Sequence, residues 1–557
     1  MRSLKRSTLF IILLCVMASA ALAQAPQKQG TGIITGRVTL GEKGMANVVV
    51  ALYPSDRTSP QRISVARATT DYEGRYRLMN VPAGRYNIIA IAPTMVGPSD
   101  GQYGDFGKFV TVAEGETVEK MDIALARGGV ITGRITDADG APVVEEQVRL
   151  NLAEKQMVQG RTFPSFNPFM FRTDDRGVYR IYGIPPGRYT VSVGESAQDG
   201  SIHIGYGGRG YYTRTFHPGV TDAAKATVIE VTEGSEATNV DITVGRKAQT
   251  FTATGRVVDE NGKPVAGVYV AQGAVTGDRI GAYGMDMPTD QQGHFRLDGL
   301  SPGRYAAFVW NNGKTDGYSD PVVFEIAEGD VSGLELKLRQ GSSISGVAVI
   351  EGTTNSGILA KLSELSLIAS PSERTEGLTA PNFSNTKIAP DGSFRLGGLR
   401  QGKFRLYLGG YPPPKGFVIT RVEREGVTQP LIEVGPGALV TNVRVVLEYG
   451  TGTVRGLVKS ESGSLPEGSR ISVSARRVGE GAERAMRGAQ ADSRGHFVIE
   501  GLPTGNYELL LSVQMINGRP VRLPPIKQSV SVVNGAEAEV TFTVDLNAKP
   551  VEGSNND

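Results

Sequence analysis

Residues 174–189 read DDRGVYRIYGIPPGRY, and this stretch decides the fold because its pattern returns along the chain. An Asp opens it and a Gly stands three positions later, which is typical of a type I turn. The alternation from Val178 to Ile181 predicts a half-buried strand. IPPG predicts a second turn, and Tyr189 begins another alternating strand. The stretch therefore predicts two strands joined by a tight turn, with the aromatic side chains in a core.

The pattern occurs five times. The first Gly of each copy follows the previous one by 103, 116, 99 and 103 residues, which predicts five tandem domains. The fourth copy has Ala389 where the others have Asp and places Asp391 beside its Gly, so we expect its turn to be built differently.

Each domain opens with a further strand, such as Gly-Arg-Val at 36–38, and closes on another. Several short strands with regular turns in about 100 residues, and no long amphipathic helix, are typical of an antiparallel β-sandwich. The high content of Gly, 72 of 557 residues, fits many tight turns. We therefore predict an all-β fold of five antiparallel β-sandwiches, followed by a disordered tail at 547–557; the sandwiches are expected at 31–127, 129–247, 250–340, 341–449 and 450–546.

The combination of Gly-Arg-Val, a turn such as Asp259 to Pro264 and the repeated motif resembles the carboxypeptidase regulatory-like domain. The resemblance extends over nearly all of the chain after residue 23, is clearest in copies two and three, and is weakest in copy four. It implies a transthyretin-like β-sandwich, grouped with carbohydrate-binding-like folds. In that family the domain is a non-catalytic accessory of peptidases or outer-membrane receptors, or forms arrays on secreted bacterial proteins. Because no catalytic or barrel segment accompanies the copies, the resemblance implies an array.

Residues 1–23 have the three parts of a secretory signal peptide: an Arg/Lys-rich start, an apolar run at 9–17 and Ala21-Leu22-Ala23. A retained membrane anchor is the alternative, but the run is shorter than the ~20 residues a bilayer needs. We expect export to the periplasm, the outer surface or the medium. Cleavage removes Cys15, the only Cys, and three of 59 Lys and Arg residues, so the remainder is nearly neutral. This charge predicts no nucleic-acid partner, and no other segment is expected to span a membrane.

The sequence predicts no enzyme, cofactor or metal site. None of the four His residues begins a His-x-x-Glu or His-x-x-x-His pair, so the zinc site of a peptidase is not expected. Residues 205–210 satisfy Gly-x-Gly-x-x-Gly, but they lack the strand-to-helix context that dinucleotide binding requires.

Copy two carries two insertions, at 157–171 and 201–218, that are rich in aromatic residues. Exposed rings can stack on sugars or anchor partner proteins; alternatively, the insertions cover a sheet edge or a neighbouring domain. Trp310, on the strand face opposite Tyr305, is either exposed or fills an interdomain contact. The candidate ligand-binding residues are Phe163, Phe166, Phe169, Tyr206, Tyr211, Tyr212, Phe216, His217 and Trp310.

These features predict an exported, non-catalytic binding or scaffold protein of the bacterial cell envelope, with glycans or envelope proteins as partners and carbohydrate recognition through the loop aromatics. The alternative is a structural spacer or adhesion stalk, which Lys–Asn crosslinks would favour; a hydrolase or a peptidase accessory subunit is least favoured. The junctions at 125–129 and 447–452 have no Pro/Ser tether, which predicts limited bending between domains.

Overall fold

The computed structural model describes residues 32–55, 63–97, 107–153, 171–195, 211–285, 288–311, 315–373, 377–410, 414–461, 465, 470–479, 486–516, 519–520 and 524–545. Its regular elements are almost all strands, and the sheets fall into five successive pairs. The predicted fold of tandem β-sandwiches is therefore confirmed. We number the sandwiches 1 (β1–β10), 2 (β11–β18), 3 (β19–β27), 4 (β28–β36) and 5 (β37–β44). The helices among the described residues are short: η3 (Ala223–Lys225), α2 (Ser356–Ala360) and η4 (Lys361–Glu364).

The first sheet of each sandwich is built around its opening strand. The opening strands are β1 (Gly32–Leu40), β11 (Gly129–Thr136), β19 (Phe251–Val258), β28 (Ser342–Glu351) and β37 (Gly452–Ser460). Each pairs antiparallel with the first strand of the motif, which is β5 (Arg75–Val81), β13 (Val178–Ile184), β22 (His294–Leu300), β31 (Ser393–Leu399) or β40 (His496–Leu502). Each also pairs parallel with the closing strand, which is β10 (Ile123–Arg127), β18 (Ile242–Thr243), β26 (Val331–Lys337), β36 (Leu439–Tyr449) or β44 (Glu537–Val544).

Further strands extend these first sheets. They are β2 (Lys43–Gly44), β7 (Met95–Val96) and β9 (Thr117–Val118) in sandwich 1, β17 (Glu236–Ala237) in sandwich 2, and β33 (Phe417–Arg424) and β34 (Val427–Thr428) in sandwich 4. Because β33 pairs with β36, the first sheet of sandwich 4 continues beyond its closing strand.

The second sheet is built around the second strand of the motif. These strands are β6 (Gly84–Ile91), β14 (Gly187–Val193), β23 (Gly303–Trp310), β32 (Gly402–Leu408) and β41 (Gly505–Ile516). On one side they pair with β3 (Val49–Pro54), β12 (Val148–Leu152), β20 (Tyr269–Thr276), β29 (Ser366–Pro371) and β38 (Arg470–Arg477). On the other side they pair with β8 (Lys108–Val112), β16 (Ile229–Val231), β25 (Val322–Ile326), β35 (Ile432–Val434) and β43 (Ile526–Val532).

Edge strands complete the second sheets. They are β4 (Ala66–Thr69), β15 (Thr215–Phe216), β21 (Arg279–Met285), β30 (Ser384–Lys387), β39 (Met486–Gln490) and β42 (Arg519–Pro520). A separate two-stranded ribbon in sandwich 3 consists of β24 (Gly317–Tyr318) and β27 (Arg339–Gln340).

The Asp of the motif builds its turn through its own carboxylate. Asp174 Oδ1 accepts the backbone N–H groups of Val178 at 2.7 Å and Arg176 at 3.0 Å, and this hydrogen bonding holds the pKa of Asp174 below its usual range. Ala389 has no such acceptor in copy four. Asp391 accepts the N–H of Ser393 at 2.9 Å instead, so the side-chain hydrogen bonds of this turn differ, as the sequence predicted. Its backbone hydrogen bonds, from Ala389 N–H to Ser393 O and from Gly392 N–H to Ala389 O, are those of the Asp174 turn.

The motif aromatics lie in the cores. Tyr179 is buried, and its hydroxyl donates to Val240 O of the closing segment at 2.6 Å. Gly133 of the opening strand lies so close to the same carbonyl that a Cβ there would collide with it. The Gly of Gly-Arg-Val/Ile is therefore required because the closing segment approaches the opening strand at this point. Tyr189 is also buried and donates to Pro185 O at 2.9 Å.

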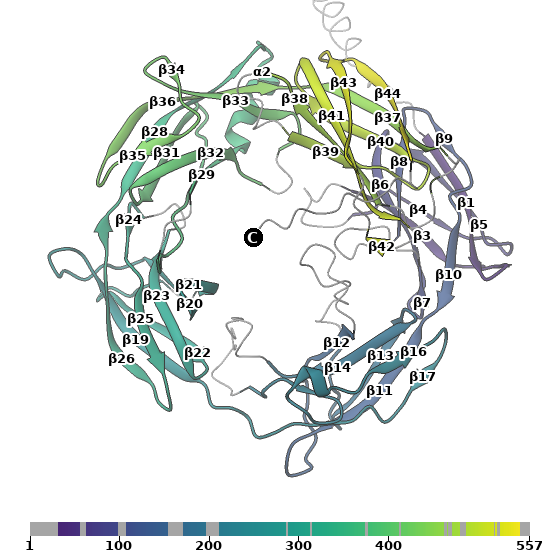
Figure 1. Ribbon diagram of the computed structural model, residues 1–557, viewed down its shortest axis with the longest axis horizontal. Helices are drawn as coiled ribbons and strands as arrows, with labels where there is room; N and C mark the ends of the chain where they lie inside the picture. Colours follow the sequence, from purple (N-terminus) through teal and green to yellow (C-terminus); the bar gives the residue numbers. More distant parts are fainter. Residues whose placement is uncertain are drawn as a thin grey trace, which may run out of the picture.

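The five sandwiches are arranged in a ring, and sandwich 5 returns to contact sandwich 1 (Figure 1). The first sheets lie toward the rim and the second sheets toward the centre, as β11 and β12 show in sandwich 2 and β19 and β20 in sandwich 3. Successive sandwiches are therefore all bent toward the same side. The sequence predicted limited bending at the junctions but not this common direction.

Candidate functional site

Three of the junctions between sandwiches share one backbone contact. A Gly before the opening strand donates its N–H to the segment that follows the second motif strand of the preceding sandwich. The pairs are Gly128 to Thr94 O at 3.0 Å, Gly341 to Asp316 O at 2.9 Å, and Gly450 to Gly416 O at 2.8 Å. A Cβ at Gly128 or Gly341 would collide with the backbone of Gly183 or Gly398. Glycine therefore lets consecutive sandwiches touch through their backbones, which fixes the direction of the bend.

Side chains reinforce the junction between sandwiches 3 and 4. Trp310 lies edge-on to Phe383 of sandwich 4, with ring centroids 5.3 Å apart, and packs with an apolar cluster around Phe308 and Ala380. Arg400 of sandwich 4 donates to Ser319 O of sandwich 3 and lies 5.0 Å from the centroid of the Tyr318 ring. Trp310 is half-buried in this contact. Of the two positions that the sequence left open for it, the structure shows the interdomain one.

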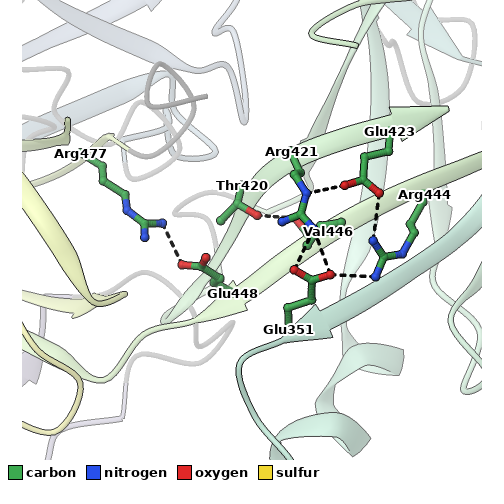
Figure 2. Close-up of polar contacts among 8 residues, drawn as sticks. All are labelled: Glu351, Thr420, Arg421, Glu423, Arg444, Val446, Glu448 and Arg477. Carbon is green, nitrogen blue, oxygen red and sulfur yellow. Dashed lines mark hydrogen bonds and ion pairs between the residues drawn. The ribbon is translucent and has the colours of Figure 1, made fainter. Parts of the chain in front are cut away.

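The junction between sandwiches 4 and 5 is tied by arginines. Arg487 of sandwich 5 donates to Pro414 O at 2.7 Å and Phe417 O at 2.8 Å, where β33 begins. Burial lowers the pKa of Arg487. Arg477 pairs with Glu448 across the junction at 2.8 Å (Figure 2).

A charge network on sandwich 4 holds β33 against the rest of its sheet (Figure 2). Arg421 and Arg444 both bind Glu351 of β28, with nearest distances of 2.8 and 2.7 Å, and both also bind Glu423. Hydrogen bonds from the two guanidinium groups lower the pKa values of Glu351 and Glu423. One network of ion pairs therefore joins three strands of sandwich 4, β28, β33 and β36.

The ring-closing contact joins sandwiches 5 and 1, which are not consecutive in the chain. It is formed by Asp492 and Arg494 of sandwich 5 with Thr111, Glu116 and Arg85 of sandwich 1. Asp492 is 3% exposed, and its Oδ2 accepts the backbone N–H of Thr111 at 3.1 Å. Its Oδ1 accepts the N–H of Arg494 at 3.0 Å within its own turn. One carboxylate therefore shapes the motif turn and joins segments 381 residues apart in the chain.

Arg494 makes the most contacts across this interface. Its Nη2 donates to Thr111 O at 2.6 Å and lies 3.1 Å from Asp492 Oδ2, while its Nη1 pairs with Glu116 at 3.2 Å. Arg85 of β6 donates to Gln490 O at 3.2 Å. Burial lowers the pKa of Arg85, and the negative charges of Asp492 and Glu500 oppose this lowering. The contact is thus a polar, partly buried interface in which the donors and acceptors named here are hydrogen-bonded to one another.

Half of the aromatic candidates from copy two can be placed. Phe163, Phe166, Phe169 and Tyr206 lie outside the described residues. Tyr212 is buried in the core of sandwich 2 with Lys247 Nζ 5.1 Å from its ring centroid, a position that suits packing better than ligand stacking. Tyr211 is half-buried and donates its N–H to Ala248 O at 3.2 Å. Phe216 is half-buried in β15, and His217 Nδ1 lies 2.6 Å from Asp241 O. These four residues belong to sandwich 2, whereas Trp310 lies at the junction between sandwiches 3 and 4.

Sequence reasoning missed the ring-closing residues, because Arg494 occupies the same motif position as Arg176, which is exposed. Within the described ranges, no group of three or more His, Cys, Asp or Glu residues could hold a metal ion. No helix in the part of the chain that the structure describes is long and apolar enough to cross a membrane.

Comparison with known proteins supports the resemblance for one sandwich. The carboxypeptidase regulatory-like domain model matches residues 252–339, so this segment of sandwich 3 is identified as that domain. No curated protein matches the sequence.

Similar solved structures include a Bacillus anthracis TIE protein, with 11% identity, coverage of 94% of this chain and 75% of that chain, and a TM-score of 0.16. A streptococcal ancillary pilin has 15% identity, coverage of 57% and 99%, and a TM-score of 0.17. The minor pilin GBS52 of Streptococcus agalactiae has 14% identity, coverage of 38% and 96%, and a TM-score of 0.21.

Proposed function

We propose that the protein is an exported, non-catalytic binding scaffold of the bacterial cell envelope whose sandwiches work as a closed ring. The observation that carries this proposal is the ring-closing contact through Asp492 and Arg494. An extended spacer or stalk would have to break this contact and expose its buried polar groups. Opening would exchange these hydrogen bonds for hydrogen bonds to water. Because a hydrogen bond to a charged group contributes about 1.5–3 kcal/mol net, the contact favours the closed form over the stalk.

The chemistry-bearing side chains that we can place have structural roles, which supports a non-catalytic protein. The motif Asp residues accept turn N–H groups, as Asp174 does. His294 Nδ1 lies 3.2 Å from Asp290 in such a turn. Glu351 and Glu423 form ion pairs with Arg421 and Arg444 in sandwich 4. These groups position backbone and strands rather than converge on a reacting atom.

A closed ring suits a scaffold because the contacts at three junctions and at the ring closure hold most of its outer sheets in defined relative positions. Closure within one chain also needs only a modest contact, since the two partners are held in the same molecule. Export through residues 1–23 is part of the proposal, and N-terminal sequencing should show a mature chain that begins at Gln24.

Hydrogen exchange tests the closed ring at one atom. The N–H of Thr111 donates to Asp492 of sandwich 5, so this amide should exchange slowly in the intact protein and faster in an Arg494→Ala variant. The amides of β14 in sandwich 2 serve as a reference that the variant should leave unchanged. Fast exchange at Thr111 in the intact protein would contradict the proposal.

A further inference from the structure

A groove of about 920 Å³ lies on the solvent-facing side of the first sheet of sandwich 3. This sheet is on the rim side of the ring (Figure 1). The polar lining of the groove comes from three neighbouring strands and the turn before β22. It includes the side chains of Thr254, Arg256, His294, Arg296, Asp298 and Glu335. The groove is of the size of small-molecule sites, which are about 300–1,000 Å³.

The charges of this groove are arranged as guanidinium–carboxylate pairs. Arg256 contacts Glu335 Oε2 through Nη2 at 2.8 Å and Nε at 3.2 Å. Arg296 Nε contacts both oxygens of Asp298, at 2.8 and 2.9 Å. Both arginines are more than half exposed. A guanidinium has five N–H donors and a carboxylate about four acceptor sites, so each pair keeps donors and acceptors for a ligand.

The same residue types recur at these positions on sandwiches 1 and 2, although Arg37 and Arg134 donate to backbone carbonyls, Glu73 O at 2.7 Å and Arg176 O at 3.0 Å, where Arg256 binds a carboxylate. The strand register places Thr35 opposite Arg77, Thr132 opposite Arg180 and Thr254 opposite Arg296. In each case the Thr is followed by Gly and a second Arg, at Arg37, Arg134 and Arg256. Arg180 also has a carboxylate partner, Glu236, at 2.6 Å. Three successive sandwiches thus present one repeated set of side chains on their outer faces.

Folding does not require these arginines. Val347 and Leu457 take the position of Arg256 in sandwiches 4 and 5, and Val498 takes that of Arg296 in sandwich 5. Those sheets have the same pairing of opening and motif strands. The repeated arginines therefore contribute something other than the pairing of the strands.

We propose that the groove of sandwich 3 binds a neutral glycan chain, with the matching faces of sandwiches 1 and 2 as further sites. This inference rests on the binding role proposed above and names its ligand class. A sugar hydroxyl both donates and accepts, so it can bridge a guanidinium and its carboxylate. Asp298 and Glu335 would repel an acidic chain. A peptide cannot add as a strand here, because the groove lies on a sheet face whose central strand, β19, is paired on both sides.

Calorimetric titration of the full mature protein tests this proposal. The probes are cellohexaose, maltohexaose and chitohexaose as neutral chains, a hexamer of galacturonic acid as the acidic chain, and a mixed polar hexapeptide. The variant is Arg256→Val with Arg296→Val, which uses residues that the chain itself carries at these positions. The matched control is Arg339→Ala in the same sandwich, which removes an exposed ion pair with Asp320 outside the groove.

We expect at least one neutral hexasaccharide to bind, the double variant to bind it at least about tenfold more weakly, and the control to match the parent protein. Absence of neutral glycan binding at millimolar concentration, stronger binding of the acidic chain or the peptide, or undiminished binding by the double variant would overturn the proposal. Thr111 amide exchange on the same samples reports ring closure separately, so failure of glycan binding is distinguishable from failure of the closed ring.

Discussion

Replacing Arg494 by Ala should open the ring in a measurable fraction of molecules. Its guanidinium donates to Thr111 O at 2.6 Å and pairs with Glu116 at 3.2 Å. It also lies against the Asp492 carboxylate, which is buried at the interface. The variant therefore loses the direct contacts and leaves Asp492 with fewer partners.

The magnitude follows from these contacts. A hydrogen bond to a charged group contributes about 1.5–3 kcal/mol. The pair with Glu116 is partly solvated, at 26% and 27% exposure of the two side chains, and adds about 0–1 kcal/mol. A loss of about 2–3 kcal/mol in closing free energy corresponds to a shift of about 30- to 150-fold toward the open form. High salt should shift the parent protein in the same direction by screening the ion pair.

The assay is a distance measurement between sandwiches 1 and 5. Labels on cysteines introduced at Tyr72 and Val478, which are both well exposed, suit this purpose because the chain's only natural Cys lies at position 15. We expect one short, narrow distance distribution for the parent and a second, longer population for Arg494→Ala. Arg176→Ala is the matched control, because Arg176 holds the same motif position in sandwich 2 and is exposed. Identical distributions for all three proteins would refute the assigned role of Arg494.

Three further predictions concern stability. Hydrogen bonds from Arg421 and Arg444 lower the folded-state pKa values of Glu351 and Glu423. The contribution of these carboxylates to the free energy of unfolding should therefore be complete above about pH 4.5 and be lost as the pH falls through the lowered pKa values. In urea unfolding, Glu423→Gln should lose less stability than the parent protein as the pH is lowered, and an equal loss would exclude this linkage. Tyr212→Ala should destabilise sandwich 2 by about 3 kcal/mol because the ring is in its core, whereas Tyr211→Ala should cost less; equal small losses in thermal unfolding would place Tyr212 outside the core. Residues 250–340 expressed alone should give a β-type circular dichroism spectrum and a cooperative melt because sandwich 3 has its own core, and a coil spectrum would count against independent folding.

The parts of the fold that the sequence predicted are those set by local chemistry. The turn at Asp174 and the burial of Tyr179 and Tyr189 follow from spacing within sixteen residues, so the sequence alone predicts the two motif strands and their turns. The parallel pairing of opening and closing strands was not predicted, because those strands lie at opposite ends of each domain. Trp310 was assigned to an exposed position or to a junction, since alternation shows only which strand face a residue is on.

The ring itself could not be predicted from the repeats. Asp492 and Arg494 look like any other copy of the turn, and their partners in sandwich 1 are nearly four hundred residues away. Nothing in Thr111 marks it as a partner, because its backbone N–H and C=O make the contacts. Closure depends also on the summed bend of the junctions, which the contacts at Gly128, Gly341 and Gly450 help to set.

Small-angle X-ray scattering of the mature protein in solution tests the closed ring most directly. The account predicts the pair-distance distribution of a closed ring for the parent protein, and a longer maximum dimension for Arg494→Ala with Arg85→Ala. A parent protein that already scatters as an extended arc, with a maximum dimension that the double variant does not change, would contradict it.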